Sequence, residues 1–136
     1  MKKFYLDTNI WLDYFENRSD GLRPLGEFAF QFLKKAIESN SVIYCSDLVI
    51  TELNNVLTKE VVDSRISPLK NDLTYVKPTK EDYFFAKKIA SSFNIHFTDA
   101  FHASIASRLK ANLVTRDKHF DYLDFIEVKK PEEVLF

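Results

Sequence analysis

Hydrophobic and polar residues along this chain follow two periods, because short apolar runs alternate with longer stretches of helical spacing. Five of the runs have the length and the β-branched or aromatic content of buried strands. They cover residues 2–6, 42–45, 73–76, 113–115 and 125–128. The first run stops at Asp7, and a helical pattern begins at once. The pattern therefore predicts strands and helices in alternation.

Between these runs, apolar residues recur three and four positions apart, as they do on one face of a helix. This spacing predicts helices at residues 9–18, 25–39, 47–61, 79–93 and 99–110. Ser46, Thr79 and Thr98 directly precede or open three of these segments, and their residue types favour helix caps. Residues 62–71 carry serine and proline and are expected to form a connection.

Strands that alternate with helices predict a parallel sheet covered by helices on both faces. The length of 136 residues is that of one domain, and a hydrophobic content of 46% is enough for a substantial core. No apolar run approaches the ~20 residues that a membrane-spanning helix needs. We therefore expect one α/β domain over residues 1–136, with three α/β/α layers around a central parallel sheet of about five strands.

Composition narrows the function classes. The net charge of −1 excludes a protein that binds polyanions by bulk charge. The single cysteine, Cys45, lies in an apolar run, which is typical of a reduced, cytoplasmic protein. Asp7 interrupts the only apolar run near the N-terminus, so no signal peptide is expected. The two glycines form neither a GxGxxG nor a P-loop motif, which argues against those nucleotide sites.

Four acidic residues stand where a parallel sheet places its chemistry. Asp7 and Asp117 follow predicted strands, and ligands of such sheets bind beyond the carboxyl ends of strands. Glu52 and Asp99 lie in early turns of helices that we expect to begin at the same edge. Singly, each has an ordinary alternative, such as a helix cap for Asp7 or a solvated turn for Asp117. Glu52 is the most telling, because it borders a core-facing stripe and glutamate is rarely buried unpaired.

Together, four carboxylates at one edge would repel one another unless a cation neutralised them. Hard divalent ions do so, and Mg²⁺ prefers a few carboxylates together with waters and substrate phosphate oxygens. No set of histidines and cysteines has the spacing of a zinc site. The sequence therefore predicts a divalent-metal site, and one or two ions are compatible with it.

Four short motifs surround these acids. They read DTN at residues 7–9, SDLVITEL at 46–53, TDAFHA at 98–103 and TRDKHF at 115–120. In order and spacing they resemble PIN domains, and most closely the small ribonuclease toxins of VapBC toxin–antitoxin pairs. The resemblance covers almost the whole chain and finds no departure among the four acids.

The resemblance implies a PIN-like fold and an endoribonuclease that depends on Mg²⁺ or Mn²⁺, with an antitoxin protein as partner. It carries catalytic and metal-ligand roles onto four residues, which are Asp7, Glu52, Asp99 and Asp117. It also suggests supporting polar roles for Asn9 and Thr115. The expected reaction is metal-assisted hydrolysis of an RNA phosphodiester by water, which leaves a 5′-phosphate and a 3′-hydroxyl.

Basic and aromatic residues add weaker indications. Arg116, Lys118 and His119 flank Asp117 and are candidates for contacts with RNA phosphates, although a charged turn explains them about as well. His102 lies three residues after Asp99, so a helix would make them neighbours and allow a hydrogen bond between them, while a packed or solvated histidine is the more common alternative. Exposed aromatic residues, if clustered, would suggest an interface for the antitoxin or for a homodimer.

Three other protein classes share some of these sequence features with a metal-dependent nuclease. A haloacid-dehalogenase-like phosphatase also opens with a strand and an aspartate, but it wants a second aspartate at the position of Asn9. A receiver domain wants an aspartate after the third strand, where this chain has Lys77. A catalytically silent PIN-like module that binds RNA or protein keeps the fold. The complete set of four acids favours a nuclease over that module.

Overall fold

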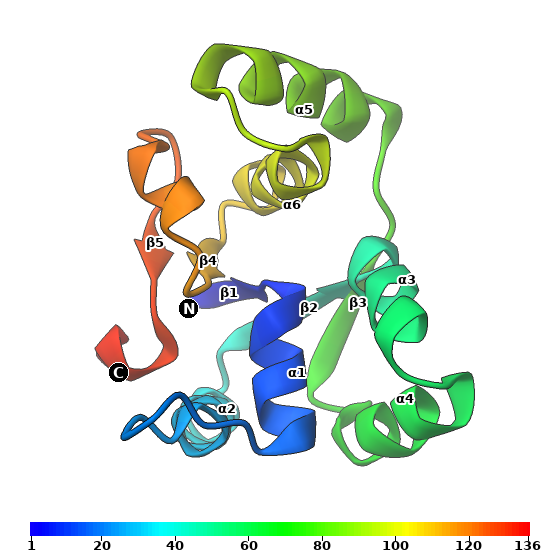
Figure 1. Cartoon of the computed structure of the whole chain (residues 1–136), viewed down its shortest axis with the longest axis vertical. Helices are drawn as coiled ribbons and strands as arrows, with labels where there is room; N and C mark the ends of the chain where they lie inside the picture. Colours follow the sequence, from blue (N-terminus) through cyan, green and yellow to red (C-terminus); the bar gives the residue numbers. More distant parts are fainter.

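A parallel sheet of five strands forms the centre of the computed structural model, which describes all residues, 1–136 (Figure 1). Its strand order is β3-β2-β1-β4-β5, and every neighbouring pair is parallel. The strands are β1 (Lys3–Leu6), β2 (Val42–Ser46), β3 (Leu73–Val76), β4 (Asn112–Val114) and β5 (Val128–Lys129). The predicted parallel sheet of about five strands is confirmed, although β5 begins three residues later than the apolar run suggested.

Helices cover both faces of this sheet. Figure 1 shows α5 and α6 on one side of the strands and α1 and α2 on the other, which confirms the three-layer prediction. The α-helices are α1 (Thr8–Glu16), α2 (Leu25–Glu38), α3 (Asp47–Val56), α4 (Lys59–Ile66), α5 (Lys80–Phe93) and α6 (Phe97–Arg108). Short 3-10 helices are η1 (Ser67–Leu69), η2 (Lys118–Tyr122) and η3 (Pro131–Glu133). None of the helices combines the length and the apolar character needed to cross a bilayer.

The central strand β1 positions the rest of the core. Its residues Phe4, Tyr5 and Leu6 are at most 1% exposed. Both faces of the strand are covered, and this is why it reads as a continuous apolar run rather than an alternation. From β1 the chain builds outward through β2 and β3 on one side and returns to β4 and β5 on the other. The order therefore reverses between β1 and β4, and such switch points are where parallel sheets bind ligands.

One predicted helix is in fact two. The prediction of a single helix at 47–61, followed by a connection at 62–71, is wrong, because α3 ends at Val56 and α4 begins at Lys59. The backbone of Leu57 is extended, and the Thr58 hydroxyl accepts a hydrogen bond from the Val61 N–H at 3.3 Å. This cap starts a new helix, whereas the apolar spacing on its own runs through the break.

The predicted caps have mixed outcomes. Ser46 caps α3 by accepting from the Val49 N–H at 3.2 Å, and Thr79 forms a capping box at the start of α5. The prediction that Thr98 caps the next helix is wrong. Helix α6 begins at Phe97, two residues earlier than predicted, with His96 at the N-cap position and no side-chain cap bond. The first turn of α6 therefore leaves its polar side chains free for other contacts.

Candidate active site

The switch point between β1 and β4 brings two of the predicted acids together. Asp7 directly follows β1, and its N–H donates to the carbonyl of Val114 at 3.0 Å. The Thr115 hydroxyl donates to Asp7 Oδ2 at 2.9 Å and accepts from the N–H of Asp117 at 3.1 Å. One buried threonine thus joins the segments that carry both carboxylates.

Asp7 does not act as a helix cap. It occupies the N-cap position of α1 but makes no side-chain cap bond, so the ordinary alternative for this residue does not hold. The side chain is buried, and this burial raises the pKa of Asp7. The hydrogen bond from Thr115 opposes that rise, and the nearby charge of Glu52 adds to it. A cation beside Asp7 would stabilise its ionised form and lower its pKa again.

Asp99 and Asp117 lie close together at the same edge of the sheet. Together with His119 they offer three ligand atoms that lie within 4.8 Å of one another. Asp117 also caps η2, because its Oδ1 accepts from the His119 N–H at 2.9 Å. Partial burial raises the pKa of Asp99, and the charges of Asp117 and Asp7 raise it further. Three of the predicted acids are therefore electrostatically coupled at one edge of the sheet.

Glu52 reaches the same edge from α3 and is held by two hydrogen bonds. Its Oε1 accepts from the Thr8 hydroxyl at 2.7 Å and from Nε2 of His102. Burial raises the pKa of Glu52, but the bonds with His102 and Thr8 outweigh it and lower the value overall. The open alternative of a bond between His102 and Asp99 is therefore wrong, since His102 bridges to Glu52 on another helix. Sequence reasoning missed Thr8, although it sits directly beside Asp7 in the first motif.

The other predicted residues differ in whether their side chains are free to contact a ligand. Asn9 is exposed and its side chain makes no hydrogen bond within the chain. Arg116 forms a bidentate pair with Glu132 at 2.7 and 2.8 Å and lies over the ring of Phe28. Its guanidinium is thus occupied within the fold, which argues against the predicted contact of Arg116 with RNA. Lys118 is exposed beside Asp117 and stays available.

The oxygen donors at this edge suit a hard divalent cation. Asp99 accepts no hydrogen bond in the chain, and Asp7, Glu52 and Asp117 each use only one carboxylate oxygen for side-chain bonding. Free carboxylate oxygens in a partly buried, like-charged group match the ligand preference of Mg²⁺ and Mn²⁺. His119 adds an imidazole, which Mn²⁺ tolerates better than Mg²⁺ does.

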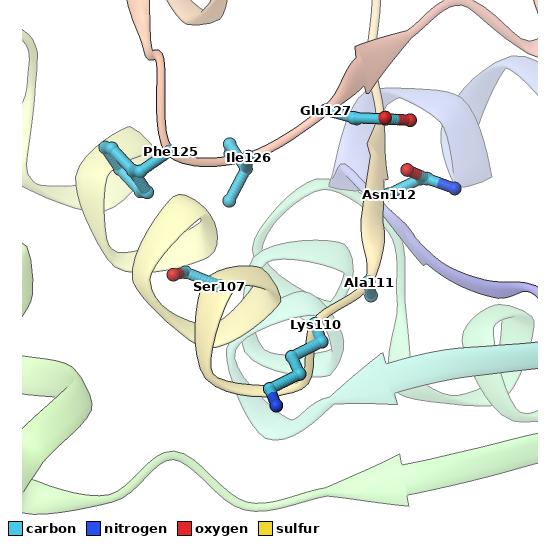
Figure 2. Close-up of a pocket in the computed structure, with 7 residues that line it drawn as sticks. All are labelled: Ser107, Lys110, Ala111, Asn112, Phe125, Ile126 and Glu127. Carbon is cyan, nitrogen blue, oxygen red and sulfur yellow. The ribbon is translucent and has the colours of Figure 1, made fainter.

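One cavity lies away from the four acids. It has a volume of about 350 Å³ and is lined by Lys110, Ala111 and Asn112 at the start of β4, together with Ser107, Phe125, Ile126 and Glu127 (Figure 2). The start of β4 is at the opposite edge of the sheet from the acids. A second cavity of about 310 Å³ adjoins them, because His119 lines it with Asn94, Ile95 and His96. Of the residues near the acids, His119 is the one that borders this second cavity.

A comparison of the chain with models of known protein families assigns its family. The model of the PIN domain family matches residues 4–126. The chain belongs to the PIN domain family. This membership supports a nuclease as the general class, and the matched segment includes all four acids of the site. No curated protein matches the chain.

Solved structures share the fold of this PIN domain. VapBC2 from Rickettsia felis, bound to a DNA fragment from its promoter, superimposes with a TM-score of 0.75 at 19% identity, covering 94% of this chain and 98% of the other. A toxin–antitoxin complex from Klebsiella pneumoniae gives 0.68 at 19%, with 96% and 98% covered. VapBC-1 from nontypeable Haemophilus influenzae gives 0.72 at 17%, with 96% and 99% covered. At these identities the likeness establishes the fold.

The raised pKa of Asp99 leads to a prediction about stability. In the folded state Asp99 binds a proton more readily than in the unfolded chain, so metal-free protein loses stability as pH rises above the unfolded value of 3.8. Replacing Asp99 by Asn should therefore raise the melting temperature in EDTA at pH 7, and this gain should shrink toward pH 3.8. Most substitutions destabilise, so a rise is discriminating.

Asp124→Asn is the matched control, because Asp124 is exposed and the change in charge is the same. Its melting temperature should stay close to that of the parent. Thermal melts at several pH values measure both variants. A lower melting temperature for Asp99→Asn in EDTA would show that Asp99 stabilises α6 rather than sharing a repulsive site.

Proposed function

We propose that this PIN domain is a metal-dependent endoribonuclease that hydrolyses RNA phosphodiester bonds. The observation that carries the proposal is the convergence of Asp7, Asp99 and Asp117 at the switch point, with Glu52 held at the same edge. Burial raises the pKa of Asp99, and the charges of Asp117 and Asp7 raise it further. A scaffold that only binds RNA or protein has no need to maintain such repulsion.

The proposed cofactor is Mg²⁺ or Mn²⁺, as one or two ions. When bound, such an ion supplies a Lewis acid for the phosphate and lowers the pKa of a coordinated water toward 7. Asp7, Glu52, Asp99 and Asp117 would hold it. Thr115 orients Asp7 by its hydrogen bond, and Thr8 does the same for Glu52. Water as the nucleophile leaves a 5′-phosphate and a 3′-hydroxyl.

We further propose that the chain is the toxin of a toxin–antitoxin pair and acts in the cytoplasm. Support comes from the fold shared with VapBC2 and with the toxin–antitoxin complex of Klebsiella pneumoniae. The chain also presents aromatic side chains at its surface. Phe30 on α2 is 42% exposed and stacks on Tyr14 of α1, with ring centroids 6.3 Å apart. An antitoxin would cover such a surface, and a homodimer is the alternative occupant.

The nuclease proposal is tested on purified protein with single-stranded RNA. Cleavage should require Mn²⁺ or Mg²⁺ and stop in EDTA. Asp7→Asn should lower the rate by more than ~100-fold, above the range usual for residues that only support a metal ligand. Asp124→Asn, an equal change in charge at an exposed position, should cleave like the parent. Full activity of Asp7→Asn, or cleavage in EDTA, would refute the mechanism.

Lys118 should contribute to RNA binding and not to the chemical step. Its exposed ammonium lies beside Asp117, where it can meet a phosphate near the scissile one. Lys118→Ala should weaken binding and lower the slope of log affinity against log salt by about 1. Lys110→Ala, at the opposite edge of the sheet, is the control and should leave the slope unchanged. Equal slopes of log affinity against log salt in all three proteins would show that Lys118 does not contact RNA phosphates.

Toxicity is tested separately in cells. Induced expression of the parent in a bacterial host should arrest growth, because RNA cleavage without an antitoxin is unrestrained. Asp7→Asn should leave growth unaffected at the same expression level. If the parent cleaves RNA in vitro but host growth is normal, the toxin assignment fails and the nuclease assignment stands.

A further inference from the structure

A buried series of hydrogen bonds runs from the acidic site into the core. Starting at Glu52, it passes through His102 and Tyr5 to Ser46, and we call these four residues the Glu52 network. The Tyr5 hydroxyl lies 2.7 Å from His102 Nδ1 and 2.8 Å from Ser46 Oγ. His102, Tyr5 and Ser46 are each at most 1% exposed. None of their side-chain polar atoms lacks a partner.

The ends of the network determine the direction of its bonds. At one end, Glu52 is a carboxylate at neutral pH, so its oxygens only accept, and both the Thr8 hydroxyl and His102 Nε2 must donate to Oε1. At the other end, Ser46 Oγ accepts from the N–H of Val49, so its own proton is free to go to Tyr5. Both ends of the network therefore favour hydrogen bonds that are donated in the direction of Glu52.

Only one arrangement satisfies every member when the imidazole is neutral. With its proton on Nε2, His102 has an acceptor at Nδ1, and the Tyr5 hydroxyl donates to it. The Tyr5 oxygen then accepts from Ser46. Burial raises the pKa of Tyr5 far above its ordinary value, so its hydroxyl keeps the proton that it donates. The opposite tautomer would place the bare Nε2 lone pair against the carboxylate of Glu52.

We infer that His102 is a positioning residue for Glu52, and that Tyr5 sets the Nε2–H tautomer of His102 which this role requires. The inference rests on the proposed function, because Glu52 matters as a metal ligand only there. With Oε1 held by His102 and Thr8, the other oxygen of Glu52 is left for the cation. His102 sits on α6 one turn after Asp99, so the same helix supplies one acid and restrains another.

Two nearly isosteric variants separate this role from simple packing. The amide nitrogen of Gln at position 102 reaches the place of Nε2 and can still donate to Glu52. That of Asn reaches only the place of Nδ1, beside Tyr5. His102→Asn should therefore lower Mn²⁺ affinity, measured by calorimetry, by about 10–100-fold, while His102→Gln retains most of it. Tyr5→Phe, which keeps the packing and removes the hydroxyl, should fall between them.

Thermal melts of the same proteins serve as the structural control. A residue that only packs would make both His102 variants lose stability and Mn²⁺ affinity together. Equal affinities for Asn and Gln at position 102, whether reduced or unchanged, would overturn the inference. If His102→Asn does not fold, Tyr5→Phe decides, since unchanged Mn²⁺ affinity in that variant excludes control by Tyr5.

A readout that needs no metal tests the network itself. Nitrogen-15 NMR of the His102 ring at neutral pH should show the Nε2–H tautomer in the parent and a mixture in Tyr5→Phe. An Nδ1–H tautomer in the parent would overturn the inference. Failure of the parent to bind Mn²⁺ would instead refute the proposed function, so the two failures are distinguishable.

Discussion

The bond between the Asp7 N–H and the Val114 carbonyl joins the ends of β1 and β4, and the acidic site depends on this junction. β1 is the central strand and the sheet order reverses beside it, and parallel sheets bind ligands at such switch points. Thr115 then fixes the carboxylate of Asp7 and the backbone of Asp117 from one hydroxyl. Small shifts of β4 would therefore move both acids together.

Placing these acids at the junction makes it less favourable to ionise them. Burial disfavours the charge on both Asp7 and Asp99, and the charges of Asp117 and Asp7 disfavour the charge on Asp99 further. Glu52 departs from this pattern, since hydrogen bonds from Thr8 and His102 keep its pKa below the ordinary value. The site thus contains acids that resist ionisation beside one that is held ionised. A divalent cation would neutralise the repulsion among these carboxylates. The electrostatics of the site are therefore compatible with the nuclease class that the PIN domain family supports.

Residues of the buried core also hold the side chains of the site in place. Tyr5 and Ser46 belong to β1 and β2, yet they connect through His102 to a residue at the rim of the site. Arg116 plays a comparable part on the other side, because its pair with Glu132 ties the segment before Asp117 to η3. The positions of the acids therefore depend on polar contacts with residues behind them in the fold.

Local patterns in the sequence were enough to determine the alternation of strands and helices and the position of Asp7 at a strand end. Periodicity and residue type act over a few positions, so they also revealed the caps at Ser46 and Thr79. They missed the break at Thr58 because a cap inside an apolar stretch leaves the spacing intact. Only the tertiary structure decided that His102 binds Glu52, 50 residues away, and that Tyr5 binds His102 across 97 residues. Such contacts depend on strand order and on how each helix is rotated against the sheet, and no local pattern encodes either.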